Sequence, residues 1–306
     1  MVFLAKQSRP EMNRALQRRE NVSGYLFLLP SMIFFIGFVV LPMFICIYLS
    51  FTDANMHAGT TSFVAFSNYT QLFQDKTFLK ALWNTFLIVL VSVPTVCAFS
   101  LWVASSIYKM HSAARSFFRI VFYLPVITGS VAVTVVWKWI YNNYYGVFNY
   151  VLKGVGVIEK NINWLGNEKT ALWCIILILF TTSVGQPIVL YFSALGNVDH
   201  SLVEAAQVDG ATNLQVFWRI KWRQIMPTTL YILVITTINS FQCFALIQLL
   251  TQGGSGTNTV MYYIYYTAFK LTEQAGHFGY ANAMGVVLAL AIAILSAVQF
   301  KVAEEK

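Results

Sequence analysis

The stretch EAAQVDGATNLQVFWRIKWRQIMP, residues 204–227, is polar and lies between two apolar segments. Its Asp-Gly step is typical of a turn, and the residues on either side of that step favour helices. A membrane span needs about 20 mostly apolar residues, so this polar stretch must lie outside the bilayer. It therefore predicts a helical hairpin that connects two spans of an all-α membrane protein.

The composition of the whole chain supports a membrane protein. Of its 306 residues, 58% are hydrophobic and only 10% are charged, and the mean hydropathy is +0.63. Soluble domains carry about 25% charged residues. The net charge of +8 is typical of Lys and Arg in cytoplasmic loops, so we expect a lipid bilayer and no nucleic acid as a partner.

Six segments are apolar and long enough to span a bilayer. They lie at residues 25–51, 84–108, 117–141, 171–195, 228–250 and 280–300. The expected fold is therefore all-α, with six transmembrane helices in one domain over residues 25–300. The other parts are a basic N-terminal arm at 1–24, the hairpin loop at 197–227 and a tail at 301–306.

Lys and Arg mark the cytoplasmic side of a membrane protein. With the N-terminus inside, that side holds 13 of the 20 basic residues, at positions 6, 9, 14, 18, 19, 109, 115, 119, 219, 221, 223, 301 and 306. The other side holds six, at positions 76, 80, 153, 160, 169 and 270, and Lys138 lies near a span end. We therefore expect both termini and the hairpin in the cytoplasm.

The spans contain no group that could power transport. They hold no Asp, Glu or His, the residues that relay protons or ions in many carriers. The glycine-rich run GGSGTNT, residues 253–259, lacks the lysine of a phosphate-binding loop. The four cysteines and four histidines show no metal-ligand spacing. If the protein moves a solute uphill, the energy must therefore come from a partner, and no metal or cofactor is expected on this chain.

Two other functional classes remain as alternatives. A membrane-embedded transferase or protease needs polar catalysts clustered near one membrane face, and the sequence shows no such cluster. A channel would conduct its solute without any ATPase partner, so the presence of such a partner distinguishes it from an importer.

The hairpin has the features of two capped helices. Ser201 is the expected N-cap of the first, with Glu204 three residues later in capping-box spacing. Gly210 ends that helix, because glycine tolerates the left-handed backbone of a helix terminus. Thr212 is the expected cap of the second helix, and Pro227 marks the entry into the fifth span.

The hairpin resembles the EAA coupling motif of binding-protein-dependent ABC importer permeases. The matching positions are Glu204, Ala205, Ala206, Asp209, Gly210, Ala211, Phe217 and Ile220. The chain departs from the motif at Trp222-Arg223, where the family has Leu-Pro. Stretches such as YLPVITGSVAVTVVWKWIYNNYYGVFNYVL (residues 123–152) and FALIQLLTQGG (residues 244–254) resemble the carbohydrate-uptake branch. Within that branch the chain resembles the first permease subunit of maltose, glycerol-phosphate and lactose systems.

The resemblance implies a type I ABC importer fold and a complex in the bacterial cell membrane. This chain and a second permease subunit would form the pathway for a sugar or oligosaccharide. Two ATPase subunits would bind ATP and Mg²⁺ and would each receive a coupling hairpin, while an extracellular solute-binding protein delivers the sugar. Glu204 would pair with a basic group of the ATPase, Gly210 would form the turn, and this chain would carry no catalytic site.

The fourth and fifth spans carry uncharged polar groups that suit a sugar. Thr236, Ser240 and Cys243 have the i, i+4, i+7 spacing of one helical face, and Asn239 is adjacent. The resemblance implies that the contacts of the maltose-type relative fall on six positions. These are Val184, Gly185, Ile188, Thr236, Ser240 and Cys243. They have less amide and aromatic character here than in that relative, so maltose is not the expected solute.

Overall fold

The computed structural model describes residues 14–55, 61–269 and 277–304, and in these ranges the chain is helical apart from turns, loops and two isolated β-bridges. In chain order the α-helices are α1 (Arg14–Phe35), α2 (Leu41–Ser50), α3 (Ser67–Gln74), α4 (Lys76–Tyr108), α5 (Ser112–Ile127), α6 (Ser130–Ile140), α7 (Val147–Gly154), α8 (Ala171–Ser183), α9 (Gly185–Gly196), α10 (His200–Val208), α11 (Asn213–Val216), α12 (Trp222–Phe241), α13 (Ala245–Leu250), α14 (Val260–Phe269) and α15 (Phe278–Glu304). The predicted all-α class is confirmed. Parts of the expected arm and tail, residues 1–13 and 305–306, lie outside the described residues.

Four helical stretches among the described residues are long and apolar enough to cross a membrane. They are Asn21–Ser50, Lys76–Tyr108, Asn213–Leu250 and Phe278–Val302. Two further pairs qualify if each is one bent span: α5 with α6, bent by 97°, and α8 with α9, bent by 40°. These stretches correspond to the six predicted segments, and the crossing of a bilayer by all six stays a prediction.

The third segment is not the single helix predicted for residues 117–141. The helix α5 ends at Ile127, and Thr128 and Gly129 adopt extended backbone before α6 begins. Pro125 in the last turn of α5 favours this break, because proline removes a backbone donor from the helix.

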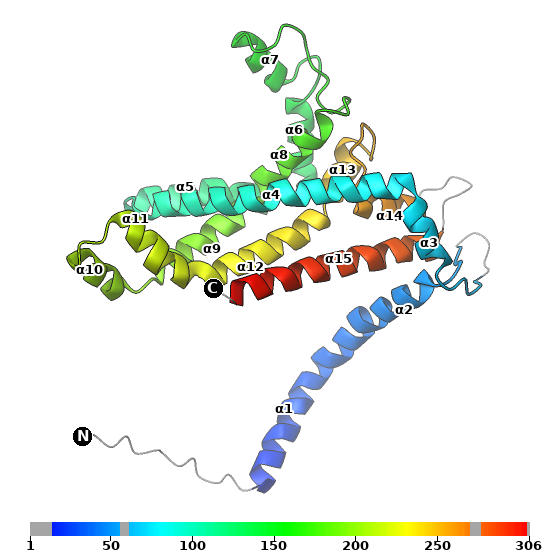
Figure 1. Cartoon of the computed structure of the whole chain (residues 1–306), viewed down its shortest axis with the longest axis horizontal. Helices are drawn as coiled ribbons and strands as arrows, with labels where there is room; N and C mark the ends of the chain where they lie inside the picture. Colours follow the sequence, from blue (N-terminus) through cyan, green and yellow to red (C-terminus); the bar gives the residue numbers. More distant parts are fainter. Residues whose placement is uncertain (1–13, 56–60, 270–276, 305–306) are drawn as a thin grey trace.

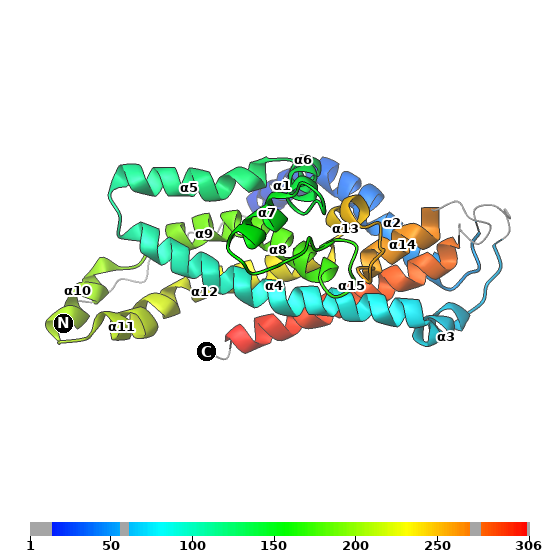
Figure 2. The ribbon, with the colours of Figure 1, turned by 90° about the horizontal axis from the view of Figure 1, so that it is seen from above.

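A bundle of long helices forms the body of the molecule, and α4 runs along its length (Figure 1). Helix α4 packs against α8, α9 and α12, while α15 packs against α12, α14 and α2. Seen from above, α5 lies to one side of α4, and α15 crosses the line of α4 (Figure 2). The bundle core includes Val93, Cys97, Tyr191, Ile232 and Met284, all of them buried.

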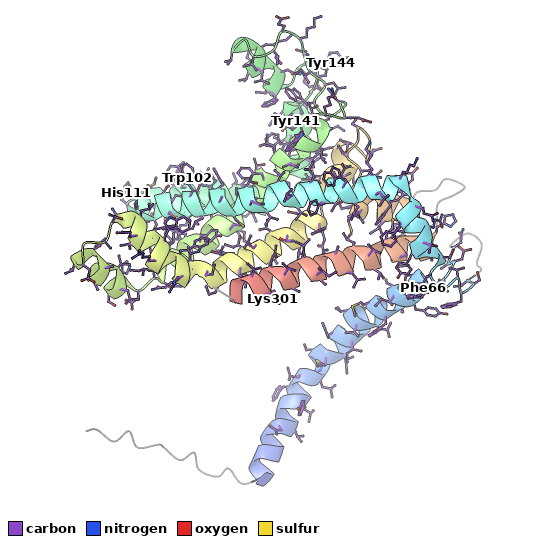
Figure 3. The ribbon with its side chains drawn as sticks, in the orientation of Figure 1. Phe66, Trp102, His111, Tyr141, Tyr144 and Lys301 are labelled. Carbon is purple, nitrogen blue, oxygen red and sulfur yellow. The ribbon has the colours of Figure 1, made fainter. Side chains whose placement is uncertain are left out.

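The bundle has two distinct ends. The helices α10 and α11 form one end, and α3 and α14 lie at the other (Figure 1). His111 and Lys301 lie toward the hairpin end, and Phe66 lies at the opposite end (Figure 3). A third part, made of α6 and α7, projects away from the bundle and carries Tyr144 (Figure 3).

The first helix stands away from the bundle (Figure 1). None of the apolar window of Asn21–Ser50 is buried within the chain. Only α2, which continues α1 through a π-helical segment at Ile36–Val40, packs against α15. The apolar surface of α1 is therefore left for lipid or for another subunit.

Candidate functional site

The hairpin begins at Asp199, which caps α10. Its carboxylate accepts hydrogen bonds from the backbone N–H of Ser201 (2.9 Å) and from the Ser201 hydroxyl (2.7 Å). These bonds hold the pKa of Asp199 below its ordinary value. The predicted cap at Ser201 is thus wrong, because Asp199 precedes it and offers a charged acceptor to the helix N-terminus. The Asp199 N–H also donates to the Gln224 side chain (3.0 Å), which ties the hairpin to α12.

The predicted turn at Gly210 is present. Gly210 has φ +82°, a conformation that glycine adopts without a steric penalty. The Gly210 N–H donates to the Gln207 carbonyl (3.1 Å), and the Ala211 N–H donates to the Ala206 carbonyl (2.9 Å). This pair of bonds is a Schellman motif, so the turn between α10 and α11 has a defined geometry.

The second helix of the hairpin continues without a break into the helix of the fifth predicted span. Thr212 caps it in a reciprocal capping box with Gln215, as its sequence position indicated. The helix then runs through α11, a π-helical segment at Phe217–Lys221 and α12 as far as Phe241. Pro227 therefore lies inside α12 and does not mark a boundary, and the departure at Trp222-Arg223 leaves the helix continuous.

The EAA residues divide into an exposed and a partly buried set. Glu204, Ala205, Asp209 and Gly210 are exposed, and Ala206, Ala211, Phe217 and Ile220 are partly buried. Four apolar side chains on the same hairpin are also exposed, Leu202, Val208, Leu214 and Trp218, with Val208 exposed to 87%. Exposed apolar side chains around a carboxylate are typical of a protein interface.

A pocket of about 370 Å³, lined by both polar and apolar residues, lies where three helical segments are interrupted. We call it the break pocket. Its lining includes Thr128 beside the α5–α6 break, Ser183 beside the α8–α9 break, and Gln242 and Cys243 between α12 and α13. Broken helices expose backbone polar groups, which membrane proteins tolerate where the break is covered by protein or lines a cavity. Transporter binding sites are often built at such breaks.

The break pocket is lined by uncharged polar groups alongside apolar ones. The polar lining residues are Thr128, Ser130, Thr182, Ser183, Gln186, Thr236, Asn239 and Gln242. No charged residue belongs to the described lining. Hydroxyl and amide groups can donate to and accept from sugar hydroxyls. Thr128 and Ser130 were not singled out from the sequence. Pro125 and Gly129 beside them are residue types that favour an interruption of a helix, and this signal was not used.

The structure brings only some of the predicted pathway residues to the break pocket. Thr236, Asn239 and Cys243 line it. Ser240 does not, and it is only 2% exposed. The single helical face predicted for Thr236, Ser240 and Cys243 is wrong, because α12 ends at Phe241 and Cys243 lies in the break.

The other three predicted pathway residues serve helix packing. Val184 and Ile188 are buried in an apolar cluster with residues of α4. The Val184 carbonyl accepts from the Ser100 hydroxyl (3.3 Å). Gly185 is buried against α5: a Cβ there would collide with the Phe122 carbonyl and lie 2.8 Å from a Val126 methyl. The structure does not place these residues at the break pocket.

Gly185→Ala should therefore destabilise the protein. The added methyl group meets backbone of α5, and overpacking costs about 1–3 kcal/mol. Thermal unfolding of the purified chain in detergent measures the loss. The matched control is Gly285→Ala on α15, where a Cβ meets nothing within 4 Å, and it should keep or slightly raise the midpoint. Equal midpoints for both variants would contradict the close contact between α5 and α9.

The family of the chain follows from comparison with known proteins. A family model described as "Binding-protein-dependent transport system inner membrane component" matches residues 63–303. The chain belongs to this family. It is a multi-pass membrane component of a transport system and not an enzyme, and the resemblance to ABC importer permeases is confirmed.

Relatives and solved structures agree with this family membership. The chain is 33% identical over 292 residues to the probable ABC transporter permease protein YesP of Bacillus subtilis (strain 168), covering 93% of this chain and 91% of that protein. It is 29% identical to the lactose transport system permease protein LacF of Rhizobium radiobacter, with 95% and 97% covered. A chain from the crystal structure of a bacterial ABC transporter involved in the import of the acidic polysaccharide alginate matches with a TM-score of 0.80. At 24% identity, with 96% of this chain and 99% of that chain covered, this last match shows the shared fold.

Proposed function

We propose that this family member is a permease subunit of an ATP-driven importer of sugars or oligosaccharides. The observation that carries the proposal is the convergence of three helix breaks on a pocket whose described polar lining groups are all uncharged. Neutral hydroxyls and amides bind sugars without requiring a charged solute. The relatives support the same class of solute, because LacF is named for lactose and AraP of Bacillus subtilis (strain 168) for arabinooligosaccharides.

The hairpin is proposed to dock on an ATPase subunit. One continuous helical stretch connects it to the break pocket, from Asn213 to Phe241. At about 1.5 Å per residue this stretch is roughly 40 Å long. A displacement of the hairpin by a partner would therefore move the residues of α12 that line the break pocket, Thr236 and Asn239. ATP and Mg²⁺ would bind to the ATPase and not to this chain.

The remaining partners are proposed from surfaces that the chain leaves uncovered. The apolar helix α1 is not buried within this chain. A second permease subunit would pack against part of its surface. That subunit would also supply the other half of the translocation pathway. An extracellular solute-binding protein would deliver the sugar at the end opposite the hairpin.

The proposed orientation places the hairpin in the cytoplasm. Seven basic residues lie on the hairpin, on α5, directly after α4 or near the end of α15: Lys109, Arg115, Arg119, Arg219, Lys221, Arg223 and Lys301. Asn213→Cys on exposed α11 should therefore react with a membrane-impermeant maleimide in inside-out vesicles only. Tyr150→Cys on exposed α7 should react in right-side-out vesicles only. The reverse pattern would contradict the orientation. The chain with only its native cysteines gives the background labelling.

Transport by the reconstituted complex tests the proposed function. Proteoliposomes holding this chain with its second permease and ATPases should accumulate a radiolabelled oligosaccharide. Accumulation should require ATP at the hairpin face and the solute-binding protein at the opposite face. Flux without ATP would favour a channel, and the absence of uptake for every neutral and acidic oligosaccharide tested would contradict a sugar importer.

A further inference from the structure

A second cavity, of about 760 Å³, lies at the end of the bundle opposite the hairpin. We call it the end pocket. It is formed by α3, α14, the start of α15 and the segment that follows α2. Each of its ten lining residues carries a polar side-chain atom. Its volume is within the range of about 300–1,000 Å³ that small-molecule sites occupy.

Asp75 accepts hydrogen bonds from two tyrosines that line the end pocket. Its Oδ2 accepts hydrogen bonds from the hydroxyls of Tyr263 (2.7 Å) and Tyr280 (2.9 Å), and its Oδ1 accepts from the Thr77 N–H (2.8 Å). Burial opposes the charged form, but these bonds outweigh burial and lower the pKa of Asp75 below its ordinary value. The carboxylate is therefore ionised at neutral pH and holds two tyrosines from different helices in fixed positions.

The fixed tyrosines and two glutamines present hydrogen-bonding groups to the cavity. Because the Tyr263 and Tyr280 hydroxyls donate their protons to Asp75, their oxygen lone pairs remain as acceptors. Gln71 and Gln74, three residues apart on α3, are exposed and add amide donors and acceptors. Acceptors, amides and tyrosine rings together are the groups that bind the hydroxyls and apolar faces of a pyranose or furanose ring.

The charges of the end pocket select among saccharides. Asp53 and Asp75 both line it, and its described lining contains no Lys or Arg. Two carboxylates repel the carboxylate of a uronic acid residue. The break pocket also lacks a cation among its described lining residues. Among the described lining residues, neither the end pocket nor the break pocket therefore offers a Lys or Arg to an acidic saccharide such as the alginate that the transporter of similar fold imports.

We propose that the end pocket is a saccharide-binding site that takes an uncharged sugar unit and excludes uronates. This inference rests on the proposed function for its biological sense, because a sugar bound there would lie on the delivery side of the transporter. The binding itself requires neither ATP nor transport, so it is testable separately.

Protection from cysteine labelling tests the site. Gln74→Cys is made together with Cys46→Ala, which removes the exposed native cysteine, and the complex is placed in nanodiscs that open both faces to solvent. Labelling by a maleimide is measured with neutral trisaccharides of glucose, galactose, xylose and arabinose, and with trigalacturonate. At a concentration twice its Kd, a neutral trisaccharide should slow labelling about threefold, whereas trigalacturonate should not. The control Tyr150→Cys on α7 lies outside the end pocket and should label at one rate throughout.

A second variant, which reverses one charge of the end pocket, tests the exclusion of uronates. Asp53 is exposed, so Asp53→Lys should leave the fold intact and let trigalacturonate protect Gln74→Cys. The proposal is overturned if no neutral trisaccharide protects Gln74→Cys, if trigalacturonate protects it equally before the reversal, or if Asp53→Lys changes nothing. Protection without ATP-driven uptake would overturn the proposed function and leave the end pocket, while uptake without protection would do the opposite.

Discussion

Glu204→Lys is expected to abolish sugar import while the protein still folds and inserts into the membrane. Glu204 is exposed on α10, so the change removes no packing within this chain. Its carboxylate is proposed to face a basic group of the ATPase, and disruption of an interfacial charge pair costs about 2–5 kcal/mol. That loss corresponds to a decrease of about 30-fold or more in coupled transport. Uptake by proteoliposomes and ATP hydrolysis stimulated by the solute-binding protein measure it.

Glu159→Lys is the matched control for this charge reversal. Glu159 is also exposed, but it lies in the loop after α7, far from the hairpin along the chain. The control should retain both uptake and stimulated hydrolysis. If Glu204→Lys also imports sugar at the rate of the unchanged chain, the hairpin is not the docking element, and the exposed apolar residues Leu202 and Val208 need another explanation.

The hairpin shows how far local sequence rules extend. Gly210 and Thr212 were predicted correctly, because a left-handed turn and a capping box depend on residues within one helical turn. The helix continues through Pro227, where the sequence predicted the entry into the fifth span, for a reason outside that range. Ile225 is buried in the bundle core, and packing of this kind can offset the roughly 3 kcal/mol that proline costs inside a helix. The extent of α12 therefore depends on tertiary contacts that a local pattern does not contain.

The candidate spans could be predicted from local sequence, whereas the pathway residues depend on tertiary structure. Apolar length alone predicted the candidate spans, because the bilayer requires it of every helix. The break pocket could not be predicted in full, because it depends on where three helices stop. Periodicity from Thr236 to Cys243 assumed that α12 continues, and the break after Phe241 invalidated that assumption. Gly185 indicated a special position, but the close approach of α5 is visible only in three dimensions.

Asn239→Trp is expected to block import with the transporter still assembled. Asn239 lines the break pocket and is exposed to it, so an indole at this position would occupy a large part of a cavity of about 370 Å³. The variant also loses an amide that would bind sugar hydroxyls. Uptake should fall to the background of empty proteoliposomes, because a filled pathway cannot admit a sugar. Recovery of the intact complex in detergent and binding of the ATPases should be unchanged.

The adjacent substitution Ser240→Trp separates a blocked pathway from damaged packing. Ser240 is 2% exposed and is not part of the pocket lining, so an indole there must displace neighbouring helices, at a cost of about 1–3 kcal/mol or more. It should lower the thermal midpoint and the yield of the complex, effects that Asn239→Trp should not show. Normal uptake by Asn239→Trp would remove the break pocket from the pathway. Loss of the complex in both variants would mean that Asn239 serves packing as Ser240 does.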